Sequence, residues 1–353
     1  MMTFRQFALR PKSIPTATAW YVADLAEALG KQELYTKQSP QKLRVLREHA
    51  LIESAVSSTR IEGVEVAQDR VRTLVFGKPL LRDRGEEEVT GYRDALRLVH
   101  EKGRLLPVSG KTILRLHRLV RGDIADAGKY RAKPGEIIEI QANGERRVRF
   151  RATAPAEVPA AIAELTRSWP ECLDERWVHP LVALAAFNLD FLCIHPFRDG
   201  NGRVSRLLLL LQAYHLGYEV GRYISIERLI EQNKERYYET LEESSRGWHQ
   251  GKHDPWPYAN YLLYILKSAY REFEGRLGQV KAPRGAKTEQ VENAIDSFPG
   301  DFTLVELERL CPGVSRDMIR RVLWDLKKAG TAECLGRGPG AAWRKRGNTL
   351  KKM

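Results

Sequence analysis

The longest apolar stretches of the chain flank one short polar segment. Residues 181–194 are apolar except for Asn188 and Asp190, and a second apolar run covers residues 207–211. Runs of this kind, without a polar face, are typical of helices that are buried on all sides. We therefore predict two buried helices joined by a polar loop, residues 195–206, in which a rigid scaffold can hold reactive groups.

Apolar residues recur at helical spacing through most of the remaining chain up to residue 274. The helices expected from this pattern cover about 20–29, 41–54, 66–82, 86–102, 112–120, 158–168, 227–244 and 256–273. Gly30 is expected to end the first of them. The predicted fold class is therefore mainly α.

Residues 135–150 differ from this helical background. They contain β-branched residues on both sides of Ala142-Asn143-Gly144, which has the composition of a tight turn. A β-hairpin is the prediction, and a surface loop of strand-like composition is the alternative. The apolar positions of the hairpin are Ile138, Ile140, Val148 and Phe150.

The C-terminal part of the chain is separated by residues 275–287, which are rich in glycine and basic residues and are expected to form a linker. Beyond it, helices are expected near 288–296, at 303–310 and after Ser315. Strand-like residues around a glycine-rich tip follow at 331–343. Helix, helix-turn-helix and hairpin in this order indicate a small α+β winged-helix domain over 288–353.

Composition narrows the choice of partners and compartment. The 353 residues predict two or three domains, and the net charge of +13 favours an anionic partner such as a nucleotide or nucleic acid, unless the chain is simply a basic soluble protein. No signal peptide and no apolar run of membrane-spanning length is found, so we expect a cytoplasmic protein without a membrane partner. The four cysteines lack a CxxC spacing, which indicates neither a zinc site nor a disulfide framework.

The polar loop combines groups that suit phosphate chemistry. Gly200-Asn201-Gly202 can direct backbone N–H groups to one side at the start of a helix, and Arg203 and Arg206 share a face of that helix. Asp199 can hold Mg²⁺ between phosphates, and His195 can act as a general base on a hydroxyl. These groups within twelve residues predict transfer of a nucleotide phosphate to an alcohol.

The segment HPFRDGNGRVSR, residues 195–206, resembles the Fic motif HPFx(D/E)GNGRxxR at every specified position. The resemblance extends over about 40–270. It implies a Fic-type helical bundle with a β-hairpin flap, plus the C-terminal winged-helix domain read from the sequence. It also implies transfer of AMP from ATP to a Ser, Thr or Tyr hydroxyl of a target protein or of the chain itself.

The resemblance also implies a role for each matching residue. His195 would deprotonate the target hydroxyl and Asp199 would bind Mg²⁺. The phosphates would lie on Gly200, Asn201 and Gly202, with Arg203 on the β-phosphate and Arg206 on the γ-phosphate. Tyr237, Tyr238 and Ser245 would line the adenine side, and core packing is the alternative for these three.

An earlier segment, Ser58 to Gly63, resembles the family's inhibitory motif (S/T)xxxE(G/N). By that resemblance Ser58 and Glu62 belong to an inhibitory helix at about 50–63. Glu62 would pair with Arg206 and occupy the γ-phosphate position. A plain helix end is the alternative reading.

The resulting domain plan is an N-terminal region at 1–85, a catalytic domain at 86–274, the linker, and the winged helix. The flap, with Ile138, Ile140, Val148 and Phe150, is expected to dock a target segment as an added strand. Two other functions stay open, removal of AMP from a modified protein and DNA binding through the winged helix. That domain suits DNA or protein contact, and a homodimer is also open.

Overall fold

The fold is described in a computed structural model over residues 2–9, 13–38, 40–77, 80–140, 146–279, 286–296, 298, 300–311, 314–336, 338 and 340–346. The chain forms two compact units, Met1–Gln32 with Leu46–Gly275, and Glu33–Val45 with Arg276–Met353. Most of the region expected at 1–85 thus joins the domain expected at 86–274. Part of the expected linker lies outside the described residues.

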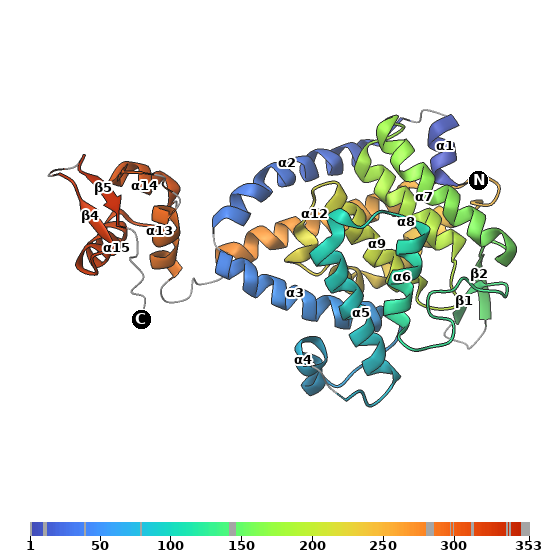
Figure 1. Cartoon of the computed structure of the whole chain (residues 1–353). Helices are drawn as coiled ribbons and strands as arrows, with labels where there is room; N and C mark the ends of the chain where they lie inside the picture. The colour runs from blue at the N-terminus through green and yellow to red at the C-terminus, as the bar shows by residue number, and fades with distance from the viewer. Residues whose placement is uncertain are drawn as a thin grey trace. The chain divides into compact units, whose positions relative to one another are not determined.

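The first unit is helical apart from one hairpin (Figure 1). Its helices are α1 (Thr3–Leu9), α2 (Thr16–Gln38), α3 (Pro40–Ile61), α4 (Gln68–Phe76), α5 (Arg84–Lys102), α6 (Gly110–Arg121), α7 (Val158–Asp174), α8 (Pro180–Ile194), α9 (Asn201–His215), α10 (Ile226–Gln232), α11 (Lys234–Ser245) and α12 (Trp256–Gln279). The end of α2, the start of α3 and the end of α12 belong to the second unit. Short 3₁₀ turns are η1 (Gly103–Leu105), η2 (Pro155–Glu157) and η3 (Val220–Arg222). Among the described residues, none of the helices has the length and apolarity that a bilayer crossing requires.

Helix α8 is the centre of this unit. The ring of His179 caps its start by accepting a hydrogen bond from Leu181 N at 3.2 Å, and Pro180 occupies the first turn, where its missing N–H is not needed. Every residue from Leu181 to Ile194 is buried. The helix packs against α1, α7, α9 and α11, as a helix without a polar face must.

Two polar residues of α8 connect it to distant segments. Asn188 donates to Ser205 O at 2.8 Å and accepts from the hydroxyl of Tyr258 at 2.8 Å. Asp190 accepts from the backbone and hydroxyl of Thr3, at 2.9 and 2.7 Å, and from the indole of Trp248 at 2.7 Å. Burial raises the pKa of Asp190 to about 6.

The expected hairpin consists of β1 (Glu136–Ile140) and β2 (Arg146–Arg151), which pair antiparallel at the edge of the helical unit (Figure 1). Since two strands alone are marginally stable, the hairpin needs support. Phe150 stacks on His249 with ring centroids 5.3 Å apart, and Arg149 Nε donates to Glu242 at 2.8 Å. Val148 is exposed. The turn and the side chains of Ile138 and Ile140 lie outside the described residues.

Several helix ends differ from the sequence-based expectation. Helix α2 continues through Gly30, because residues beyond it have partners: Gln32 donates to Gly217 O at 2.9 Å and accepts from Glu219 N at 2.8 Å. The helix expected at 227–244 is broken at Asn233, whose side chain donates back to Leu229 O at 2.9 Å. Tertiary contacts and side-chain hydrogen bonds override the local pattern at both places.

The second unit contains α13 (Ala286–Asp296), β3 (Phe302–Thr303), α14 (Leu304–Leu310), α15 (Arg316–Lys328), β4 (Ala332–Cys334) and β5 (Ala342–Lys345). The strands form an antiparallel sheet in the order β3-β5-β4. The helices and the hairpin follow the order predicted from the sequence, and β3 is an additional strand.

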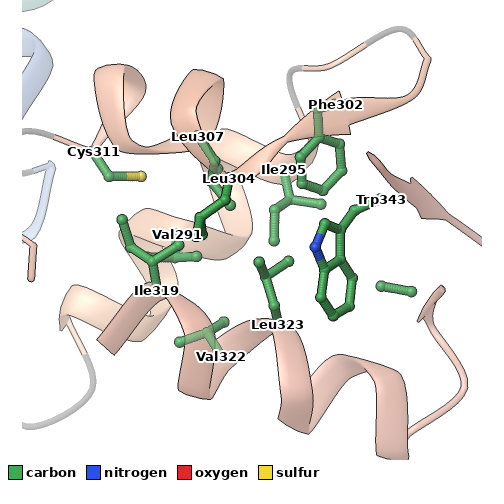
Figure 2. Close-up of a cluster of buried hydrophobic side chains, with 11 residues drawn as sticks. Val291, Ile295, Phe302, Leu304, Leu307, Cys311, Ile319, Val322, Leu323 and Trp343 are labelled. Atoms are coloured by element: carbon green, nitrogen blue, oxygen red, sulfur yellow. The ribbon is translucent and has the colours of Figure 1, made fainter. Parts of the chain in front are cut away.

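The core of this unit gathers apolar side chains from all three helices and the sheet. Its buried members are Val291, Ile295, Phe302, Leu304, Leu307, Cys311, Ile319, Val322, Leu323, Ala332 and Trp343. Figure 2 shows the labelled side chains converging between the helices and strands that carry them. Thr303 and Glu306 form a capping box at the start of α14, and Ser315 caps α15.

Candidate active site

The polar loop begins where α8 ends, at His195. This residue adopts a left-handed conformation, with φ of 50° and ψ of 61°, which directs the chain away from the helix axis. Its Nδ1 lies 3.2 Å from Leu192 O. Because a carbonyl oxygen only accepts, Nδ1 carries the proton and Nε2 keeps its lone pair. Burial and the charge of Arg131 lower the pKa of His195, so the ring is neutral at pH 7.

Asn201 and Phe197 fix the shape of the loop. The Asn201 side chain accepts from Phe197 N at 2.9 Å and donates to Phe197 O at 2.8 Å. The Phe197 ring is buried and stacks on His117, with ring centroids 3.7 Å apart. The side chain of Asn201 is therefore used by the loop itself, and its backbone N–H belongs to the first turn of α9.

Arg131 also holds the loop in place, through backbone carbonyl groups. This role was not predicted from the sequence. Its Nε donates to His195 O at 2.8 Å, and its backbone N–H donates to Pro196 O at 2.9 Å. Its guanidinium also donates to Thr153 O. In the sequence, Arg131 is one of two basic residues in Gly128-Lys129-Tyr130-Arg131, shortly before the predicted hairpin.

The first turn of α9 has features that favour an anion. Gly200 precedes it with φ of 83°, and the N–H groups and dipole at a helix start favour negative charge. Gly202 leaves room at this point: a Cβ added there would lie 2.2 Å from Glu62 Oε1. The carboxylate of Glu62 therefore lies against the backbone of Gly202, at the start of the helix.

The last turn of α3 and the residue after it contact Arg206 directly. Arg206 Nη2 donates to Glu62 Oε1 at 2.9 Å and to Ser58 O at 2.8 Å, while Nε donates to Ser58 Oγ at 2.9 Å. The Arg206 side chain is 3% exposed and that of Glu62 30% exposed. Burial alone would lower the pKa of Arg206, but the Glu62 carboxylate raises it above its usual value. The structure thus brings Ser58, Glu62 and Arg206 together.

Arg203 has a different set of partners. Its side chain is 1% exposed and lies 2.9 Å from Glu88 Oε2 and 3.2 Å from Asp199 Oδ1. Glu88 lies on α5 and was not identified from the sequence. A buried guanidinium needs a counter-charge, which Glu88 supplies.

Asp199 is surrounded by arginines. Arg121, at the end of α6, forms an ion pair with its Oδ2, and Arg84 lies 3.4 Å away. Although burial opposes ionisation, Arg203 and Arg121 lower the pKa of Asp199. This carboxylate is therefore ionised at neutral pH.

A Mg²⁺ ion fits this site if Asp199 is its one protein ligand. No group of three or more His, Cys, Asp or Glu side chains in the described ranges could hold a metal by itself. The single carboxylate of Asp199 is 43% exposed and stands beside the anion site of α9. It therefore suits an ion that takes its remaining ligands from phosphate oxygens and water.

Helix α6 supports the same loop through His117. Its Nδ1 accepts from Gly128 N at 3.0 Å, so that Nε2 carries the proton and donates to Asp199 O at 3.1 Å. Burial lowers the pKa of His117 to about 4, which keeps this arrangement neutral. His117 and Arg121 are four residues apart, so one face of α6 contacts both the backbone and the carboxylate of Asp199.

The residues expected near adenine lie in different environments. Tyr237 is buried among Tyr258 and Tyr261, with ring centroids 5.9 Å away in each case. Tyr238 is partly exposed, and burial together with the charge of Glu62 raises its pKa. Ser245 is buried and donates to Glu242 O at 3.1 Å. The surroundings of Tyr237 are those of a packed core, and adenine contact by all three stays a prediction.

The amino-acid sequence is similar to those of known proteins. Residues 107–213 match the Fic/DOC family. The protein adenylyltransferase Fic of Drosophila melanogaster is 23% identical over 321 residues, covering 79% of this chain and 60% of that protein. The protein of the same name from Nematostella vectensis is 25% identical over 224 residues, covering 58% of this chain and 45% of that protein. The chain thus spans at most about 60% of the length of these relatives.

Two solved structures resemble most of this chain. The crystal structure of a Fic family protein from Desulfovibrio desulfuricans has a TM-score of 0.60 and 25% identity, and covers 97% of this chain and 99% of that one. A Fic domain containing signaling protein from Bacteroides thetaiotaomicron has a TM-score of 0.61 and 21% identity, covering 73% of this chain and 99% of that one. The second likeness shows the fold alone.

Proposed function

Because residues 107–213 of this chain form a domain of the Fic/DOC family, we propose that the protein transfers AMP from ATP to a hydroxyl of a protein and that Glu62 restrains this activity. The arrangement of one loop carries the proposal. His195 presents an unprotonated Nε2 next to a helix start that favours anions, and Arg203 and Arg206 lie buried on that helix. Relatives that match most of this chain are named adenylyltransferases.

In the proposed reaction each of these side chains has a separate role. Nε2 of His195 takes the proton from the target hydroxyl, whose oxygen attacks the α-phosphorus of ATP and displaces pyrophosphate. The glycines at 200 and 202 let the phosphates approach the N–H groups of α9. Arg203 and Arg206 then neutralise the charge on the leaving pyrophosphate. Mg²⁺, held by Asp199, would supply further positive charge on the phosphates.

Restraint by Glu62 follows from the contacts of Arg206. A carboxylate that pairs with this guanidinium competes with the terminal phosphate for the same donors. The position of Glu62 over Gly202 adds repulsion between the carboxylate and the phosphates. Each 1.4 kcal/mol by which this contact disfavours the productive pose lowers its population about tenfold.

The experiment compares wild-type protein with Glu62→Gly. Each is incubated with ATP, MgCl₂ and cell lysate, and adducts are identified by mass spectrometry. We expect an AMP adduct on a Ser, Thr or Tyr side chain, at a yield at least tenfold higher with Glu62→Gly. If that variant modifies neither itself nor a lysate protein, AMP transfer is excluded. Incubating the wild-type protein with the adduct tests AMP removal.

The hairpin is proposed to present the target. β2 is supported by α11 and by the stacking of Phe150 on His249, and Val148 of the same strand is exposed. A target segment paired with this hairpin as an added strand would be recognised through its backbone. Val148→Pro in β2 is expected to lower transfer to a protein target without lowering the affinity for ATP, and equal loss of both would contradict the docking role.

For the C-terminal unit we propose contact with a protein. On α15, Trp324 is 55% exposed, Arg316 lies 3.2 Å from Glu308, and Arg320 lies 3.7 Å from Asp317. An exposed indole beside arginines that already have acidic neighbours suits a protein surface better than a phosphate backbone. Gel-shift assays of the full chain are expected to show no DNA binding. Binding that falls steeply between about 50 and 200 mM salt would establish phosphate contacts instead.

A further inference from the structure

A cavity of about 370 Å³ lies in the first unit, apart from the loop at 195–206. It opens between α3, α4, α5 and η3, and three of its lining residues are Arg47, Arg97 and Arg222. Leu51 and Phe76 form an apolar part of the wall. Its volume is within the range of cavities that bind small molecules.

The three guanidinium groups are held in place. Arg47 Nη2 donates to the hydroxyl of Tyr223 at 2.9 Å, and Arg97 Nη2 donates to Val75 O at 2.7 Å. Arg222 donates to His100 O and stacks over Tyr214, 4.4 Å from the ring centroid. Fixed donors lose little side-chain entropy when a ligand arrives, so they recognise an anion at low cost.

The charges around the cavity favour an anion. His100 lines it, and burial together with Arg222 and Arg47 lowers the pKa of His100 to about 3, so this ring stays neutral. Glu48 and Glu101 also line it, and like Arg47 they are exposed, so water screens the charge of all three. Arg97 and Arg222 are partly buried, where their charge is screened less, and Arg222 lies 3.6 Å from Glu219.

We infer that this cavity binds a small organic anion whose carboxylate, sulfonate or phosphate meets the arginines and whose apolar body packs on Leu51 and Phe76. The same binding stabilises the arrangement in which Glu62 contacts Arg206. The first claim, that the cavity binds an anion, is the binding half of the inference and does not depend on the proposed function. The second claim, that binding favours the contact of Glu62 with Arg206, is the regulatory half and rests on the proposed function.

The connection to Glu62 runs along α3. Leu51 lines the cavity, and Ser54, one turn further, donates to Glu227 Oε2 at 2.7 Å. Tyr92 of α5 donates to the other oxygen of Glu227 at 2.7 Å. Ser58, one more turn along α3, binds Arg206. A ligand that bridges α3 and α5 at the cavity therefore holds α3 in the position from which Ser58 and Glu62 reach Arg206.

Binding is tested on the full chain with the fluorescent anion 8-anilinonaphthalene-1-sulfonate. Its neutral analogue N-phenyl-1-naphthylamine has a related ring system without the sulfonate. We expect the anion to bind at least tenfold more tightly, and Arg47→Gln/Arg97→Gln to remove that difference. Leu51→Trp, which fills the cavity, should abolish binding of the anion. Arg115→Gln, an exposed arginine on α6, is the control and should change nothing.

Two results overturn the binding half. One is equal affinity for the two dyes, and the other is anion binding that persists in both cavity variants. The regulatory half is tested by titrating the anion into Glu62→Gln. Coupling between sites is reciprocal, so weakening the Glu62 contact should weaken anion binding several-fold. Unchanged affinity overturns this half. Neither titration involves AMP transfer, so failure of the proposed activity would be seen separately.

Discussion

Two buried arginines, three residues apart on α9, are neutralised in different ways. Arg203 is paired with Glu88 of α5 and with Asp199 of its own loop, all within the residues that build the site. Arg206 is paired with Glu62, a residue more than a hundred positions earlier, in the turn after α3. Glu88 is 6% exposed and Glu62 is 30% exposed.

This difference separates a partner needed for folding from a partner that can leave. Removal of Glu88 would leave the buried guanidinium of Arg203 with only Asp199, which is shared with other arginines, and would break a pair that has little access to water, at a large cost. Removal of Glu62 leaves Arg206 with two hydrogen bonds to Ser58, one to its hydroxyl and one to its carbonyl. The contact of Arg206 with Glu62 can therefore open without unfolding the site, as a regulated contact must.

The largest expected effect is on the chemical step. If the contact of Arg206 with Glu62 only restrains ATP binding, removing that contact should not permit AMP transfer when the base His195 is absent. Adding His195→Ala to Glu62→Gly is expected to lower AMP transfer about 100- to 10,000-fold. Radiolabel transfer from α-labelled ATP measures it, with an unchanged thermal midpoint as the control for folding. Residual transfer close to that of Glu62→Gly would assign the base to another residue.

Two matched substitutions test whether Arg203 and Arg206 depend differently on their carboxylate partners. Glu88→Gln is expected to lower the free energy of unfolding by about 3 kcal/mol, since it breaks a buried pair. Glu62→Gln is expected to lower it by about 1 kcal/mol or less, because this carboxylate is partly exposed and Ser58 remains. Denaturant unfolding followed by circular dichroism measures both. Equal losses would show that the two arginines are not held differently.

The contact between Glu62 and the backbone of α9 is tested at Gly202. A methyl group there would meet Glu62 Oε1 at 2.2 Å and Arg206 Nη1 at 3.1 Å. We expect Gly202→Ala to destabilise the wild-type protein by about 1–3 kcal/mol. The same change should cost less when Glu62→Gly is already present. A double-mutant cycle measures this coupling, and additive losses would mean that Glu62 does not lie over Gly202 in solution.

The smallest expected effect is on pH dependence. Burial lowers the pKa of His195, so its ring stays neutral to a pH below the ordinary histidine value of about 6.5. The acidic midpoint of transfer by Glu62→Gly should therefore lie below pH 6.5. The free energy of unfolding should also fall as the pH is lowered below about 6.5, because the unfolded chain binds a proton at this histidine at a higher pH than the folded chain does. A midpoint at or above 6.5 in the rate profile would contradict the burial of the base.

The sequence predicted what lies close together along the chain. His195, Asp199 and the glycines are neighbours in one segment, so their chemistry could be read directly. The pairing of Glu62 with Arg206 followed from resemblance to a short motif, because a single glutamate near a helix end carries no such information by itself. The apolar runs on both sides also predicted the burial of α8 and α9.

The partners supplied by other helices could not be predicted. Glu88 and Arg121 each resemble an ordinary charged residue on the exposed side of a helix, and their burial depends on how α5 and α6 pack against α9. Arg131 is a similar case, since its contacts are with backbone oxygens. Local patterns do not record such tertiary contacts, which also explains why Gly30 failed to end α2.

The carboxylate of Asp190 has a consequence for the order in which the protein can be assembled. It binds Thr3 and Trp248, and Thr3 also lies 2.9 Å from a ring nitrogen of His253. During synthesis, α1 can pack on α7 and α8 as soon as these helices have left the ribosome, but the contacts of Thr3 and Asp190 with Trp248 and His253 form only after residue 253 has followed. The polar network that ties α1 to α8 is therefore completed only when nearly all of this unit has been made.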